Sequence, residues 1–193
     1  MNLDDQRTEL ERMGYAIVST TDSELIAVRS RRCWDGLATK LTTVVFVRSL
    51  PSLTGAEIQA DAARMLAAAK DLDPSRLPQG LLKNRAAIAV YLAGTVEPDA
   101  RQICASPQPV RLPSLFYPAT LERSSGTAYY SKATPLWGGV FYAKFRYLAQ
   151  RLLEPANAPA KEPVSLFGVV MTVLVGALLL LGLAALVLAV VLG

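Results

Sequence analysis

Apolar and polar positions alternate in short runs over most of this chain, and the alternation stops near the C-terminus. Over residues 1–153, apolar runs are separated by polar turns, glycines and prolines, which is typical of a domain built from short helices and strands. The predicted helices cover residues 3–13, 54–70, 97–104 and 140–153. The predicted strands cover residues 15–19, 24–30, 41–49, 86–93, 115–121 and 127–131. This order predicts a single α/β (α+β) domain with a mixed sheet flanked by helices.

The middle of the predicted sheet is marked by the consecutive apolar residues Val44–Val47. Such a run is typical of a strand that is covered on both faces. Pro51 is expected to end this strand because it has no backbone N–H for the ladder. The following helix is expected to begin at Thr54, which forms a capping-box pattern with Glu57. Residues 31–40 are expected to form a basic loop between two strands.

The C-terminal part of the chain is continuously apolar. Residues 166–193 contain only apolar side chains, glycine and one threonine, and no ionisable side chain follows Glu162. As a helix this run would be roughly 42 Å long at ~1.5 Å per residue, which exceeds the ~30 Å hydrocarbon core of a bilayer. The sequence therefore predicts a transmembrane helix over residues 165–193, joined to the domain of residues 1–153 by a proline-rich linker at residues 154–164.

The position of this helix predicts how the protein is placed in the membrane. Residues 1–10 are charged and lack the apolar core of a signal peptide. The basic residues nearest to the predicted helix all precede it, and they are Lys144, Arg146, Arg151 and Lys161. Because cytoplasmic flanks carry an excess of Lys and Arg, we expect a tail-anchored, single-pass protein of the cell membrane with its domain in the cytoplasm. In that reducing compartment, Cys33 and Cys104 are expected to be free thiols packed in the core.

Small residues recur at intervals of four within the predicted transmembrane helix. They are Gly168, Thr172, Gly176, Ala185 and Ala189. Small side chains at this spacing allow two helices to approach closely in a membrane. Besides the lipid bilayer, we therefore expect a protein partner or a second copy of the chain to bind through this helix. The alternative is that these residues only reflect the abundance of Gly and Ala in such helices.

Composition narrows the chemistry that the domain could perform. The chain has 193 residues, with 20 Lys and Arg against 16 Asp and Glu, and it contains no histidine. This excludes Ser-His-Asp triads, Cys-His nucleophiles and His-ligated zinc, and two cysteines cannot fill a four-thiolate zinc site. No glycine-rich phosphate loop is present in the sequence. Any catalysis would have to use carboxylate, lysine, tyrosine or serine groups, or a metal held by carboxylates. We expect neither a cofactor nor a metal.

A group of basic residues with one tryptophan begins in the second predicted strand. Its members are Arg29, Arg31, Arg32, Trp34, Lys40 and Arg48. This group is predicted to bind phosphates, either of anionic lipid headgroups or of nucleic acid. Nucleic acid is the less favoured partner because the cytoplasmic face of a membrane attracts the same charges. The alternative is a solvated loop whose charges are offset by Asp22, Glu24 and Asp35.

Aromatic and basic residues are interleaved in and just before the last predicted helix of the domain. They are Trp137, Tyr142, Lys144, Arg146, Tyr147 and Arg151. Rings with a polar atom, placed beside cations, favour a bilayer interface, and the short linker keeps this helix near the headgroups. The alternative is that the helix covers the sheet through Phe141, Phe145 and Leu148, and both can hold on different faces.

Two stretches of the chain carry a resemblance to a known family. The first is Leu10-Glu-Arg-Met-Gly14-Tyr15 at the end of the first predicted helix. The second is the apolar strand, turn and Pro-Asp-Ala helix of residues 86–104. Together with the order helix, hairpin, central strand, long helix and strand, these stretches make residues 3–131 similar to the Mrr-type members of the restriction-endonuclease-like superfamily.

The resemblance implies where a metal-dependent active site would lie. Members of this superfamily carry an acidic residue near the second strand. In this chain, Asp22 or Glu24 would correspond to that residue. On the third strand they carry Glu or Gln followed, two positions later, by Lys. This chain has Phe46 and Arg48 at these two positions, with Val47 between them. Phe46 cannot bind a metal, and Arg48 stays protonated and cannot serve as a base. The resemblance therefore implies the fold without its catalytic residues.

These observations lead to one main hypothesis and two alternatives. We expect a tail-anchored membrane protein whose cytoplasmic domain is a non-catalytic binding or scaffolding module. The first alternative is a membrane-anchored, metal-dependent nuclease or phosphodiesterase that uses Asp22, Glu24 and a further residue. The second alternative is an accessory subunit of a membrane complex.

Overall fold

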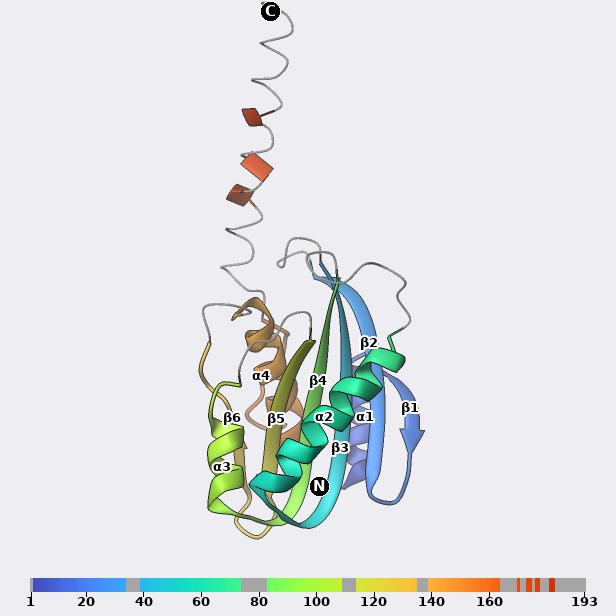
Figure 1. Ribbon diagram of the computed structural model, residues 1–193, viewed down its shortest axis with the longest axis vertical. Helices are drawn as coiled ribbons and strands as arrows, with labels where there is room; N and C mark the ends of the chain where they lie inside the picture. Colours follow the sequence, from blue (N-terminus) through green and yellow to red (C-terminus); the bar gives the residue numbers. More distant parts are fainter. Residues whose placement is uncertain are drawn as a thin grey trace, which may run out of the picture.

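Six strands form one mixed sheet at the centre of the domain, and they lie in the order in which they occur along the chain (Figure 1). The computed structural model describes residues 2–33, 39–73, 83–108, 114–134 and 139–163, together with residues 170, 173, 174, 176, 177, 181 and 182. The strands are β1 (Ala16–Thr20), β2 (Glu24–Cys33), β3 (Thr39–Leu53), β4 (Lys83–Val96), β5 (Ser114–Glu122) and β6 (Thr127–Tyr130). The first three strands pair antiparallel, β3, β4 and β5 pair parallel, and β6 returns antiparallel to β5.

Helices cover both faces of this sheet, so the domain has three layers (Figure 1). The helices α1 (Leu3–Arg12) and α4 (Gly139–Leu153) pack on one face, and α2 (Gly55–Asp71) and α3 (Pro98–Ala105) pack on the other. The prediction of an α/β domain with a mixed sheet flanked by helices is therefore confirmed.

The central strands are buried on both faces because each face is covered by a pair of helices. Val44–Val47 in β3 are fully buried, which confirms the prediction of a central strand. Since successive side chains of a strand point to opposite faces, Val45 and Val47 belong to the core beneath α1 and α4. Val44 and Phe46 belong to the core beneath α2 and α3.

The strand β3 is longer than predicted, since it continues through Pro51 to Leu53. The prediction that Pro51 ends this strand was wrong. β3 and β4 keep the same register before and after this position. Gly94 in β4 makes this possible, because a Cβ atom there would lie only 2.5 Å from the carbonyl oxygen of Pro51. The bare glycine backbone thus allows the two strands to stay together at the proline.

The strand β2 continues to Cys33, and β3 begins at Thr39. The prediction of a basic loop at residues 31–40 was therefore wrong for both ends of that range, while residues 34–38 lie outside the described residues. Arg31 pairs with Leu41 of β3, and Arg32 pairs with Lys40. The sequence did not indicate a strand at these charged residues, because the alternation of apolar residues on which the strand predictions rested is absent here.

The first and last helices of the domain contact each other as well as the sheet. The side-chain amide of Gln6 in α1 is buried and donates a 2.8 Å hydrogen bond to the Leu152 carbonyl in α4. An ion pair of 2.6 Å joins Arg151 of α4 to Glu9 of α1. These contacts connect residues that lie more than 140 positions apart in the chain.

The predicted transmembrane helix of residues 165–193 lies mostly outside the described residues. In the part of the chain that the structure describes, no helix is both long enough and apolar enough to cross a bilayer. The described residues of this segment are helical. Their exposed large apolar side chains are Val170, Val173, Leu174 and Leu181.

Cys104 in α3 is a free cysteine with a fully buried side chain. Burial raises the pKa of its thiol to about 12, so the reactive thiolate is scarce at neutral pH. The prediction of a free thiol packed in the core is confirmed for Cys104. The side chain of Cys33 lies outside the described residues.

Candidate functional site

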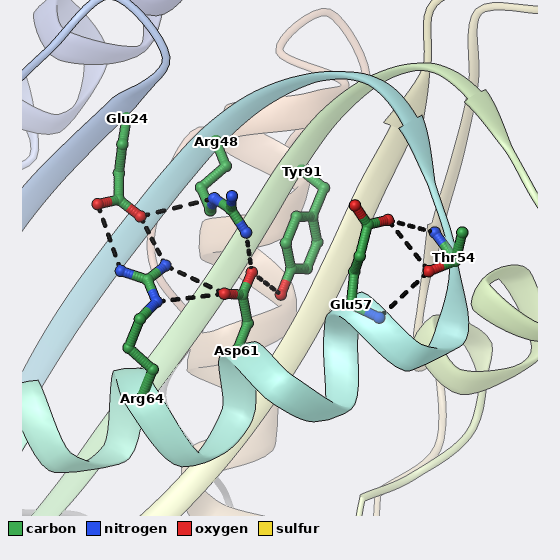
Figure 2. Close-up of polar contacts among 7 residues, drawn as sticks. All are labelled: Glu24, Arg48, Thr54, Glu57, Asp61, Arg64 and Tyr91. Atoms are coloured by element: carbon green, nitrogen blue, oxygen red, sulfur yellow. Dashed lines mark hydrogen bonds and ion pairs between the residues drawn. The ribbon is translucent and has the colours of Figure 1, made fainter.

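A cluster of charged side chains lies between the sheet and α2 (Figure 2). We call it the arginine–carboxylate cluster. Its members are Glu24 of β2, Arg48 of β3, Asp61 and Arg64 of α2, and Tyr91 of β4. Glu24 pairs with Arg48, and Arg48 pairs with Tyr91, so the three strand residues form one row across the sheet. The helix α2 places its two residues over this row.

Asp61 lies at the centre of the cluster. Its side chain is only 9% exposed. It accepts one hydrogen bond from the Arg48 guanidinium, one of 3.2 Å from Arg64 and one of 3.3 Å from the Tyr91 hydroxyl. A buried carboxylate needs such partners, because removing its charge from water costs several kcal/mol. The three donors compensate this cost.

Glu24 is held by the same two arginines. Its carboxylate accepts two hydrogen bonds from Arg64, of 2.7 and 3.4 Å, and it forms an ion pair of 3.7 Å with Arg48. Two guanidiniums therefore face two carboxylates, and each arginine bridges both acids. The formal charges of the cluster cancel.

The Tyr91 hydroxyl and the Arg64 guanidinium of the cluster both keep their protons at neutral pH. Burial raises the pKa of Tyr91 well above its ordinary value, and the negative charge of Asp61 raises it further. The hydrogen bond with Glu24 is the main cause that raises the pKa of Arg64. Tyr91 therefore stays a hydrogen-bond donor to Asp61 and cannot act as a base at neutral pH. The arginines cannot act as bases either.

The position of Asp61 follows from where α2 begins. Thr54 caps this helix, since its hydroxyl accepts a 3.2 Å hydrogen bond from the Glu57 N–H, as the capping-box pattern predicts. Counted from that start, Ile58, Asp61 and Met65 are spaced three and four residues apart and share the buried face. Asp61 therefore occupies a position in the apolar stripe of the helix and is directed into the sheet.

The cluster does not have the composition of a metal site. Among the described residues, no group of three or more acidic or cysteine side chains could hold a metal ion. On β3, the position at which the resemblance requires a metal ligand is occupied by Phe46, which is fully buried in the apolar core. Near Glu24, the positive charge that a cation would supply is supplied by the two guanidiniums. The arrangement cross-links two strands and a helix through ion pairs.

Asp22 and Glu24, the two carboxylates considered from the sequence, lie in different surroundings. Asp22 is exposed in the turn between β1 and β2, whereas Glu24 is a member of the cluster. The further acidic residue, Asp61, could not be assigned from the sequence. The available signal was a charged residue in line with the apolar residues Ile58, Met65 and Ala69.

The structure separates the six residues of the predicted basic group. Arg48 belongs to the arginine–carboxylate cluster, and Trp34 lies outside the described residues. Arg32 and Lys40 are paired across β2 and β3. The group as a whole does not form one surface, because alternate residues of β2 point to opposite faces of the sheet.

Arg29 and Arg31 point to the face of the sheet that α1 and α4 cover, and both meet Glu162 of the linker. Arg31 forms a hydrogen-bonded ion pair with the Glu162 carboxylate. Arg29 lies 3.9 Å from the second oxygen of the same carboxylate. These contacts span more than 130 positions of the chain, so the sequence gives no local signal for them.

The predicted interface residues of α4 also have different surroundings. Tyr142 is buried and donates a 2.9 Å hydrogen bond to the Gln108 carbonyl, so its assignment to a membrane interface was wrong. The alternative holds for the apolar face, since Phe141, Phe145 and Leu148 are buried against the sheet. The other members are half-buried on α4 or lie outside the described residues. The half-buried ones are Lys144, Arg146, Tyr147 and Arg151, whereas Trp137 lies outside the described residues.

The predicted helix-packing residues are almost all outside the described residues. Those outside are Gly168, Thr172, Ala185 and Ala189. Gly176 is described and helical, and a Cβ atom built there would meet nothing within 4 Å among the described residues. The predicted helix contact through these residues stays a prediction.

Comparison with protein-family models, with curated proteins and with solved structures finds no significant match to this chain.

Proposed function

We propose that this protein is a membrane-tethered binding or scaffolding module without catalytic activity. The observation that carries the proposal is the contact between Arg48 and Asp61. Each carboxylate of the cluster is neutralised by guanidinium groups that stay charged at any working pH. A metal ion would have to displace two arginines in order to reach Glu24 and Asp61.

The membrane tether is inferred from residues 165–193. This segment has no ionisable side chain, and its described residues include exposed apolar side chains, such as Val173 at 64% and Leu181 at 67%. A row of exposed apolar side chains is unfavourable in water and favourable in lipid. The ion pairs of Glu162 with Arg29 and Arg31 hold the linker against the domain, next to the start of this segment.

The absence of catalysis is tested with the full chain purified in a nonionic detergent. DNA and RNA, single-stranded and double-stranded, are incubated with Mg²⁺ or Mn²⁺, and cleavage is followed on denaturing gels. We expect the wild-type protein to match a Glu24→Gln, Asp61→Asn double variant. Metal-dependent cleavage by the wild type that this double variant lacks would contradict the proposal.

The tether is tested by extraction of cell membranes with alkaline carbonate. We expect the full chain to stay with the membranes and a chain ending at residue 163 to leave them. Release of the full chain without detergent would contradict the tether. The ending at residue 163 serves as the matched control because it retains Glu162 and the whole described domain.

A metal-dependent nuclease or phosphodiesterase is the second candidate function. One observation favours it: α1, the hairpin β1–β2, β3, α2 and β4 follow each other in the order on which the resemblance to the restriction-endonuclease-like superfamily rests. The cleavage assay above decides between the two candidates. An accessory role in a membrane complex is also proposed, and a defined co-purifying chain in the detergent extract would support it.

A further inference from the structure

A basic groove lies where the linker passes over α1, β2 and α4. It has a volume of about 310 Å³. Its charged and aromatic lining residues are Arg12, Arg29, Tyr147, Arg151 and Glu162. A smaller cavity of about 30 Å³ shares Arg29, Tyr147 and Glu162 with it, and its further charged lining residues are Arg31 and Lys144. We call the two together the linker groove.

Arginines outnumber carboxylates in the linker groove. Glu9 lies between Arg12 and Arg151 and forms ion pairs with both. Glu162 is the carboxylate that faces Arg29 and Arg31. The four guanidiniums are thus matched by two carboxylates, and the groove keeps an excess of positive charge around Glu162. Such a site attracts anions.

Arg29 and Arg31 converge on a single anion. They lie two residues apart on β2, so both side chains leave the same face of the strand. Arg31 donates a hydrogen bond to Glu162, whereas Arg29 lies 3.9 Å away, beyond hydrogen-bond distance. Arg29 is placed over the Tyr15 ring, 5.5 Å from its centre. The carboxylate therefore uses the hydrogen-bonding capacity of one of the two guanidiniums.

A phosphate group suits this pair of arginines better than a carboxylate does. Its tetrahedral oxygens accept bidentate hydrogen bonds from more than one guanidinium at once. The Glu162 side chain is 24% exposed, so it reaches the solvent at the edge of the groove. Residues 159–161, which precede it, are exposed as well.

We propose that the linker groove binds a phosphate monoester, which replaces Glu162 on Arg29 and Arg31 and thereby detaches the linker from the domain. The phosphate is carried either by a membrane lipid or by a soluble ester. The inference rests on the proposed function, since it names the ligand of the binding module. In the unliganded protein, Glu162 acts as a tethered competitor and keeps the domain attached to the linker.

The test uses the full chain in nanodiscs of phosphatidylcholine, titrated with inorganic phosphate at constant ionic strength by isothermal calorimetry. Glu162→Gln removes the competitor, so we expect phosphate affinity to rise about fivefold, the equivalent of ~1 kcal/mol at 25 °C. Glu154→Gln is the matched control, because it removes a charge from the same linker but lies outside the groove. It is expected to leave the affinity unchanged.

A second pair of variants tests the arginines of the site. Arg31→Gln is expected to weaken phosphate binding at least tenfold, whereas Arg32→Gln, on the opposite face of the same strand, leaves it unchanged. Detachment of the linker is read from trypsin cleavage after the exposed Lys161. We expect saturating phosphate to accelerate this cleavage in the wild type and to have no effect in the Arg31→Gln protein.

The source of the phosphate is distinguished by lipid composition. If a lipid is the ligand, adding phosphatidic acid to the nanodiscs weakens the apparent affinity for inorganic phosphate and accelerates cleavage after Lys161. If a soluble ester is the ligand, phosphatidic acid changes neither. No phosphate binding, or equal binding by the wild-type, Glu162→Gln and Arg31→Gln proteins, would overturn the inference. Such a result leaves the proposed function standing when the chain remains membrane-bound and inactive towards nucleic acid.

Discussion

Replacing Asp61 by Asn tests whether the arginine–carboxylate cluster stabilises the domain. The substitution keeps the size of the side chain but removes the charge that Arg48 contacts. A hydrogen bond to a charged group contributes ~1.5–3 kcal/mol, and breaking a fully buried ion pair costs ~3–5 kcal/mol. The Arg48 side chain is 27% exposed and keeps its ion pair of 3.7 Å with Glu24, so the lower range applies. We expect the free energy of unfolding to fall by about 2 kcal/mol.

The assay is equilibrium unfolding of the full chain in detergent with urea, followed by near-ultraviolet circular dichroism. With a urea dependence of ~2 kcal/mol per molar, the midpoint is expected to fall by about 1 M. Asp22→Asn is the matched control, since Asp22 is exposed, and its effect is expected to stay within ~0.5 kcal/mol.

A double-mutant cycle with Arg48→Met isolates the contact itself. We expect a coupling energy of at least ~1 kcal/mol between Arg48 and Asp61. A coupling near zero, or an Asp61→Asn variant as stable as the Asp22→Asn control, would refute the argument that this contact holds α2 on the sheet.

Three further predictions concern other parts of the domain. Gly94→Ala is expected to destabilise the domain by at least ~1 kcal/mol, because the new Cβ would lie 2.5 Å from the Pro51 carbonyl; unchanged thermal unfolding would contradict this. Hydrogen bonds from the Val96 N–H and the Ser125 hydroxyl lower the pKa of Glu122 in the folded protein. The ionised Glu122 therefore stabilises the domain fully above its pKa in the unfolded chain, ~4.3, and this stabilisation is lost as pH falls through its lower pKa in the folded protein. Glu122→Gln should therefore flatten the decline of stability with acid, and an unaltered pH profile would count against it. Because burial raises the pKa of Cys104 to about 12, iodoacetamide is expected to leave Cys104 unlabelled in the native protein at pH ~8 and to label it after unfolding. Rapid native labelling, seen by peptide mass spectrometry, would show that α3 opens.

The sequence predicted correctly those helices and strands whose signal lies in neighbouring residues. The capping pair Thr54 and Glu57 predicts the start of α2, and the apolar run Val44–Val47 predicts the central strand. The continuation of β3 through Pro51 could not be predicted in this way. It depends on Gly94 in the neighbouring strand, and a sequence pattern within one strand contains no information about its neighbour.

The candidate sites depend on contacts between distant parts of the chain. Asp61 is charged, and a charged residue on a helix is ordinarily assigned to the solvent side. Its burial becomes understandable only when Arg48 and Tyr91 are placed beneath it. Likewise, the pairing of Arg29 and Arg31 with Glu162 brings together residues from β2 and from the linker, which no local spacing connects.

The contact between α1 and α4 affects the order in which the domain can be completed during synthesis. The chain leaves the ribosome from its N-terminus, so α2 and α3 can cover their face of the sheet as soon as the first five strands exist. On the opposite face α1 contacts β1, β2 and β3, whereas Ile88, Val90 and Leu92 of β4 stay uncovered until α4 has been made. This late closure leaves an apolar strand surface available to chaperones for longer than the rest of the core.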